Sequence, residues 1–150
     1  MFIARPLVTV LCSCCLALTL AGSAFAQDIG QVKIVKGDVS IERDRQSMPA
    51  IAGTRLRTAD VLKTGADSSV GVTMSDNSLL SAGPNSILSF DRYAFDSTTN
   101  QGQFDASLKK GSLSVVSGRI AKQSPDAMTV RTPAAILGVR GTEFVVSADD

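Results

Sequence analysis

Apolar residues alternate with polar or small residues along most of the chain after residue 27. The alternation is clearest in Val32–Ile34, Val39–Ile41, Val70–Met74, Leu113–Val115 and Met128–Val130. A period of two places one face of a strand on a core and the other face in water. Val, Ile and Thr are frequent in these segments, as a half-buried pleated surface prefers. The pattern therefore predicts an all-β domain.

Turn-forming residues separate the predicted strands. The predicted turns are residues 36–38, 64–67, 75–78 and 82–85, with a longer polar connection at 96–102. Lys109 and Lys110 are expected to flank a further turn, and Ala134–Leu137 to form at most one turn of helix. The strands do not recur at a fixed interval, so the residues alone leave a β-sandwich, a small barrel and a solenoid open.

The first 26 residues have a different pattern. Arg5 is the only charged residue before Asp28, and a 15-residue apolar stretch, Leu7–Ala21, follows it. A short positive region, an apolar stretch of this length and an Ala-x-Ala ending describe a secretory signal peptide, and the stretch is shorter than the roughly 20 residues that span a bilayer. We therefore expect residues 1–26 to be a signal peptide cleaved between Ala26 and Gln27. The remaining residues, 27–150, are expected to be one exported domain with no stable membrane insertion.

Composition then removes several kinds of chemistry. All three cysteines lie within the apolar stretch, so the mature chain is expected to hold no disulfide and no thiolate site. The chain has no histidine, which is the commonest general base and a common zinc ligand. Apart from Arg5, 14 basic residues balance 14 acidic ones, and no segment gathers the positive charge that a nucleic-acid surface needs. We expect a protein that is not an enzyme, with no cofactor, no metal and no nucleic-acid partner.

The acidic residues do not form the pattern of a catalytic pair or of a cation site. They fall mainly in predicted turns, where we expect them to be solvated: Asp38, Asp67, Asp76 and Asp126. The loop that contains Asp96 and Asn100 lacks the alternating ligands and the terminal Glu of a calcium-binding loop. A polar loop without a bound cation is therefore expected there.

Arg140 stands out because it lies between Gly138-Val139 and Gly141. Glycines on both sides of a residue indicate a backbone bend that aims its side chain. Two interpretations stay open. The guanidinium either holds turn carbonyls or an aspartate and stabilises the fold, or it contacts a binding partner.

Taken in order, the motifs of this chain resemble those of the FecR domain family. They are Gly30-Gln-Val32, Gly53-Thr-Arg-Leu56, Asp60-Val-Leu-Lys-Thr64-Gly65, Val70-Gly-Val-Thr-Met-Ser-Asp76-Asn-Ser78, Gly83-Pro84-Asn-Ser86, Gly111-Ser-Leu113, Thr132-Pro133-Ala-Ala135 and Val139-Arg140-Gly141-Thr142-Glu-Phe144. The resemblance implies a solenoid-like or roll-like β fold, a periplasmic location and work by contact with other proteins. Most of the matching residues are expected to be turn and core positions.

Three functional hypotheses follow. The first is a non-enzymatic periplasmic module that offers sheet edges or turn loops to a protein partner in envelope signalling or assembly. The second is a polysaccharide or peptidoglycan binder. The third, implied by the resemblance, is a sensory component related to the regulation of iron uptake, which works with an outer-membrane transporter and a sigma factor. The residues do not indicate an oligomeric state.

Overall fold

The computed structural model describes residues 26–140 and 143–149. Nearly all regular structure is strand: β1 (Asp28–Lys36), β2 (Val39–Arg43), β3 (Gln46–Pro49), β4 (Arg55–Arg57), β5 (Val61–Thr64), β6 (Ser69–Met74), β7 (Leu79–Ala82), β8 (Ile87–Phe95), β9 (Gly102–Val116), β10 (Met128–Arg131), β11 (Ile136–Gly138) and β12 (Glu143–Ala148). One short helix, α1 (Arg119–Gln123), follows β9. The all-β class is confirmed, and each of the five segments with clear alternation lies in a strand.

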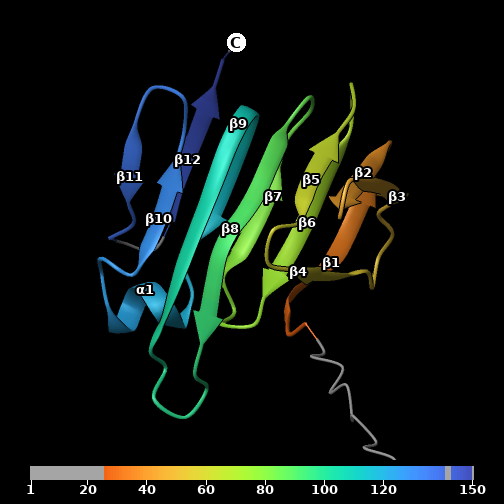
Figure 1. The fold of residues 1–150 in the computed structure, drawn as a ribbon. Helices are drawn as coiled ribbons and strands as arrows, with labels where there is room; N and C mark the ends of the chain where they lie inside the picture. The colour runs from red at the N-terminus through yellow and green to blue at the C-terminus, as the bar shows by residue number, and fades with distance from the viewer. Residues whose placement is uncertain (1–25, 141–142, 150) are drawn as a thin grey trace, which may run out of the picture.

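The strands form one curled, open sheet that folds into two layers (Figure 1). The β6 layer contains β4, β1, β6, β7, the second half of β9, and β12. The β8 layer contains β3, β2, β5, β8, the first half of β9, β10 and β11. All pairs are antiparallel except β9 with β10. This arrangement supports a roll-like sheet and does not confirm a solenoid.

The core lies between the two layers. The alternate positions of the strands that face inward are buried, and they form one hydrophobic cluster. Ile41, Leu62, Leu88 and Leu108 come from the β8 layer, and residues such as Val72 come from the β6 layer. Phe90 and Phe104 stack within it with ring centroids 6.5 Å apart. The period-two pattern in the sequence is thus the inward face of each strand.

Strand β9 joins the layers because it belongs to both. Its first half pairs with β8 as far as Lys110, and its second half pairs with β7 from Leu113 onward. Gly111 lies between these two halves with φ of +92°. A positive φ is easily adopted only by glycine. A Cβ at Gly111 would also overlap the hydroxyl of Ser86.

Two local predictions were wrong. Lys109 and Lys110 do not flank a turn, because β9 continues through both residues with its pairing partner close by. Ala134–Leu137 does not form a helical turn, because Ile136 and Leu137 belong to β11, which pairs with β10. The single described helix lies at Arg119–Gln123 instead. In contrast, the predicted turns at 36–38, 64–67, 75–78, 82–85 and 96–102 all fall between strands or at their ends.

Replacing Gly111 with alanine is expected to destabilise the protein strongly, by about 3 kcal/mol or more, because it adds both backbone strain and a clash with Ser86. Gly53→Ala is the matched control. Gly53 also has a positive φ, of +96°, but a Cβ there would meet only the amide nitrogen of Gln31 at 3.9 Å. That variant should cost only about 1 kcal/mol. Urea unfolding of both variants tests this, and equal losses would contradict the assigned role of Gly111.

Candidate protein-binding surface

The outward side of the β6 layer has no charged side chain in its middle. Strand register aligns one row across β1, β6, β7, β9 and β12, which consists of Ile34, Gly71, Ser81, Ser114 and Val145. The adjacent row places Thr73, Leu79 and Val116 side by side, between Gln31 and Glu143. We call the uncharged residues of both rows the neutral face: Ile34, Gly71, Thr73, Leu79, Ser81, Ser114, Val116 and Val145.

Four aliphatic side chains of the neutral face are exposed to solvent. The exposed fractions are 68% for Ile34, 48% for Leu79, 37% for Val116 and 69% for Val145. Single exposed aliphatic residues are common on protein surfaces, but several on one face indicate a surface that binds a partner. The other residues of the face are Gly, Ser and Thr, so its floor is nearly level.

The outward side of the β8 layer is very different, because charged residues occur along it. Lys63 forms an ion pair with Glu42 at 2.5 Å, and Arg92 lies 3.9 Å from Asp105. Asp91 accepts hydrogen bonds from the hydroxyls of Ser89 and Ser107. Buried centres of protein interfaces are depleted of charge. The contrast between the two outer surfaces therefore identifies the neutral face as the candidate binding surface.

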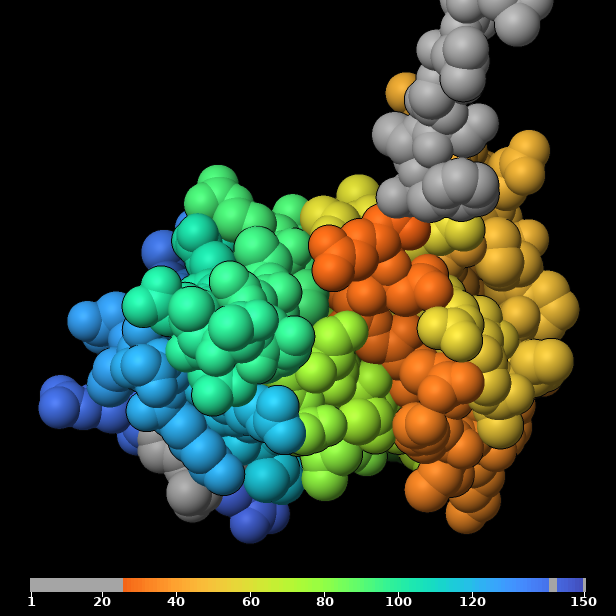
Figure 2. Space-filling model, turned by 90° about the horizontal axis from the view of Figure 1, so that it is seen from below, coloured from red at the N-terminus to blue at the C-terminus, as the bar shows by residue number. Residues whose placement is uncertain are grey.

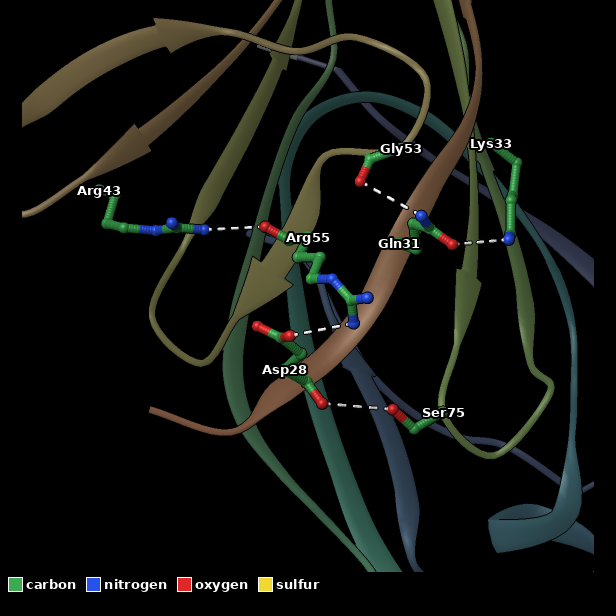
Figure 3. A network of polar contacts seen from close by, with 7 residues as sticks. All are labelled: Asp28, Gln31, Lys33, Arg43, Gly53, Arg55 and Ser75. Carbon is green, nitrogen blue, oxygen red and sulfur yellow. Dashed lines mark hydrogen bonds and ion pairs between the residues drawn. The ribbon is translucent and has the colours of Figure 1, made fainter. Parts of the chain in front are cut away.

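Polar and charged residues on β1 and β4 border the neutral face on one side (Figure 3). Arg55 forms an ion pair with Asp28 at 3.2 Å, and the ammonium group of Lys33 donates a hydrogen bond to the Gln31 side chain at 2.7 Å. The Gln31 amide in turn donates to the carbonyl of Gly53 at 3.2 Å. These contacts are exposed and hold the long side chains along the edge of the face rather than across it.

The motif residue Asp76 is a structural centre and not a solvated turn residue. It is completely buried, so the expectation of a solvated side chain at this position is wrong. Its carboxylate accepts hydrogen bonds from the hydroxyl and backbone N–H of Ser78, at 2.8 and 3.1 Å, and from the N–H of Ile120 at 3.2 Å. Ser78 also accepts a bond from Gly118. The β6–β7 turn is thereby joined to the segment that begins α1. Asp38, Asp67 and Asp126 are exposed, as expected.

Tyr93 completes this cluster from β8. Its hydroxyl accepts a hydrogen bond from the backbone N–H of Asp76 at 2.9 Å and donates one to the Asp76 carboxylate at 3.2 Å. Its ring packs edge-on against Phe104, with the ring centroids 5.3 Å apart. Burial, and next the negative charge of Asp76, raise the pKa of the Tyr93 phenol above its ordinary value.

The β6–β7 turn also contacts the start of β1, where the N–H of Ser75 donates to the carbonyl of Ile29 at 2.9 Å. Figure 2 views this end of the molecule.

A second group of motif residues closes the opposite ends of the same strands. The Ser86 hydroxyl accepts a hydrogen bond from the N–H of Ser112, next to Gly111. The Thr64 hydroxyl donates to the carbonyl of Gly83 at 2.6 Å and accepts from the N–H of Ser86 at 2.8 Å. Two more motif residues share this turn region: Gly65, whose carbonyl accepts from Asn85, and the exposed Pro84. The structure thus places these residues in turns and at contacts between the two layers of the sheet.

The C-terminal motif is only partly described. Thr132 and Pro133 form the turn between β10 and β11, where the Thr132 hydroxyl accepts the N–H of Ala135 at 3.1 Å. Arg140 is exposed, and within residues 26–140 and 143–149 its guanidinium has no hydrogen bond or ion pair. It therefore gains no visible stabilising contact in the described part of the chain. Gly141 and Thr142 lie outside the described residues.

Sequence reasoning missed both the ion pair of Arg43 with Asp60 and the neutral face. Arg43 contacts the buried Asp60 carboxylate through two nitrogens, at 2.8 and 2.6 Å, and also donates to the carbonyl of Arg55. The hydrogen bond to Asp60 raises the pKa of Arg43. The hydrogen bond to the Arg55 carbonyl joins β2 of one layer to β4 of the other, and no local pattern signals this contact or the ion pair. The neutral face had a signal in the uncharged residues that alternate with Val70, Val72 and Val115.

The described part of the chain shows neither a metal-binding cluster nor a membrane-spanning helix. No group of three or more acidic, cysteine or histidine residues is placed to hold a metal ion. No helix among the described residues is long and apolar enough to cross a membrane. Ala26 and Gln27, at the predicted cleavage point, are described and exposed, whereas residues 1–25 lie outside the described range. Cleavage between them stays a prediction.

Comparison with known proteins now identifies the class to which this fold belongs. Residues 60–150 match the family described as FecR protein. The chain therefore belongs to the FecR family, as its ordered motifs indicate. This family is associated with the cell envelope, and its domain suggests a role related to signalling there. No curated protein and no solved structure shows significant similarity to the chain.

The raised pKa of Tyr93 predicts an alkaline loss of stability. Above about pH 10 the tyrosine ionises in the unfolded chain, while the folded state retains its proton, so the free energy of unfolding falls as pH rises. Tyr93 is the only tyrosine and the chain has no tryptophan, so the near-ultraviolet absorbance of phenolate reports this residue alone. Tyr93→Phe is the control, because lysine deprotonation affects both proteins alike. A phenol that titrates near pH 10 in the folded protein would contradict the assignment.

Proposed function

We propose that this protein is an exported, non-enzymatic FecR-domain module that acts by protein–protein contact in the periplasm, in envelope signalling or assembly. The observation that carries the proposal is the difference between the two outer surfaces: one layer presents charged residues, and the other presents a level, uncharged face with four exposed aliphatic side chains. The sequence pattern favoured sheet edges or turn loops as the contact. The charge distribution instead favours a sheet face.

Membership of the FecR family supports an envelope role, and the predicted signal peptide supports export to the periplasm. The buried polar residues also favour a functional site on the surface. The buried polar groups Asp76, Ser78 and Ser86 are engaged in hydrogen bonds that hold turns and strands together. A non-enzymatic role is consistent with this arrangement, because these groups are occupied within the fold.

A polysaccharide-binding role has less support. Sugar sites commonly stack rings on exposed aromatic side chains, but Phe90 and Phe104 are fully buried and Tyr93 packs against Phe104. Phe95 and Phe144, the other aromatic residues in the described part of the chain, are half-buried and packed against the core. A sensory role connected with iron uptake is compatible with a protein-binding face, and it would connect this chain with an outer-membrane transporter and a sigma factor.

Site-specific photo-crosslinking in the producing cell tests the proposal. A photoreactive amino acid at position 79 is expected to give a discrete protein adduct, because Leu79 lies at the centre of the neutral face. The same amino acid at position 63 is the matched control. Lys63 lies on the outer surface of the other layer, and 43% of its side chain is exposed to solvent. Mass spectrometry of the adducts identifies the partner. Equal labelling from both positions, or no protein adduct from position 79, would refute contact through this face.

A further inference from the structure

Three of the four aliphatic residues of the neutral face are placed symmetrically about the middle strand, β7, and the fourth, Val116, lies opposite Thr73 in the adjacent row. Ile34 on β1 and Val145 on β12 lie at the two ends of one row, and Gly71, Ser81 and Ser114 lie between them. Leu79 lies on the middle strand, β7, in the adjacent row. The five strands span about 19 Å at the usual spacing between neighbours. The first row therefore has small side chains at its centre and larger ones at both ends, while the adjacent row has Leu79 at its centre.

A two-fold axis along the strand direction, with β7 over β7, pairs the apolar residues with one another. Ile34 then faces Val145 of the second copy, and Val145 faces Ile34 of the second copy. Leu79 faces Leu79 of the second copy, while Val116 faces the methyl-bearing Thr73 of the second copy. Face-to-face sheets pack about 10 Å apart with nearly aligned strands, and isologous two-fold contacts are the commonest in homo-oligomers.

The charges at the two margins are also complementary under the same axis. The β1 margin carries Lys33 and Lys36, and the β12 margin carries Glu143. Rotation about the axis places the positive margin of each copy over the negative margin of the other. The dimer therefore contains two equivalent contacts of this kind. Lys33 lies beside Gln31, which is in the same row as Glu143, so Lys33 is the residue best placed to meet Glu143 of the second copy.

From these observations we infer that the neutral face binds a second copy of this chain, and that two molecules stack back to back as a symmetric dimer. The inference rests on the proposed function, because it names the partner of the same surface. The face is only five strands wide, so the dimer is expected to be weak and to depend on protein concentration.

Sedimentation equilibrium of the purified exported protein over a range of concentrations tests the dimer directly. The unaltered protein should show a reversible monomer–dimer equilibrium. Ile34→Lys and Leu79→Lys should make it monomeric at every concentration. Ile136→Lys is the matched control, because Ile136 is 70% exposed against 68% for Ile34 and lies on β11, which belongs to the other layer of the sheet. This variant should dimerise normally.

Charge exchange tests the orientation of the two copies. Lys33→Glu alone and Glu143→Lys alone should each weaken the dimer about tenfold, because like charges then face each other twice. The double variant, Lys33→Glu with Glu143→Lys, should restore the affinity. Added salt should reduce all of these differences, since the charges are exposed.

The possible results separate this inference from the proposed function. A monomer at all concentrations, equal dissociation of Ile34→Lys and Ile136→Lys, or a double variant without recovery would overturn the dimer described here. If the protein is monomeric but position 79 crosslinks to a different envelope protein, the proposed function stands and the second copy is excluded. A crosslink from position 79 to another molecule of this chain supports both, and the absence of any position-79 adduct and any dimer removes both.

Discussion

The fold depends on one constraint: strand β9 belongs to both layers of the sheet. Its first half is hydrogen-bonded to β8 and β10, and its second half to β7 and β12. A buried backbone must satisfy its hydrogen bonds, so β9 determines the relative position of the layers as well as their connection. The left-handed backbone at Gly111 allows β9 to pass from one layer to the other without a break in the strand. The packing of Phe90 on Phe104 and the placement of both polar clusters follow from that geometry.

The two polar clusters act at opposite ends of the shared core. Asp76 and Ser78 connect the β6–β7 turn to the start of α1, while Ser86 and Thr64 connect the turns near Gly111. Each cluster joins segments that are far apart in the sequence. Because their side chains are buried and bonded, a substitution that removes one partner leaves another polar group unsatisfied, which is costly. These residues are therefore occupied with holding the roll together.

Local alternation was sufficient to predict the strands, since each inward face has a period of two, and turn residues were sufficient to predict most of their ends. Pairing was not predictable from local pattern. Lys109 and Lys110 resemble the flank of a turn, yet β9 continues because β8 provides hydrogen-bonding partners beside it. Asp76 was expected in water because it lies in a predicted turn. It is buried because Tyr93 and the α1 segment, distant in sequence, cover it.

The same distinction explains why the neutral face was harder to predict than the core. Alternation identifies Gly71, Thr73 and Ser114 as outward residues, but it does not reveal that they adjoin Leu79 and Val145. That proximity depends on the register of five strands that come from segments over a hundred residues apart.

The described motif residues of the FecR family lie mainly in the core, in turns and at layer contacts, whereas the neutral face consists mainly of exposed positions between them. Substitutions at exposed strand positions usually change stability little. The scaffold can therefore keep its hydrogen-bonding clusters while its outer face changes charge or size. Family membership accordingly accounts for the residues that hold the fold together, whereas the chemistry of the outer face depends mainly on residues outside those contacts.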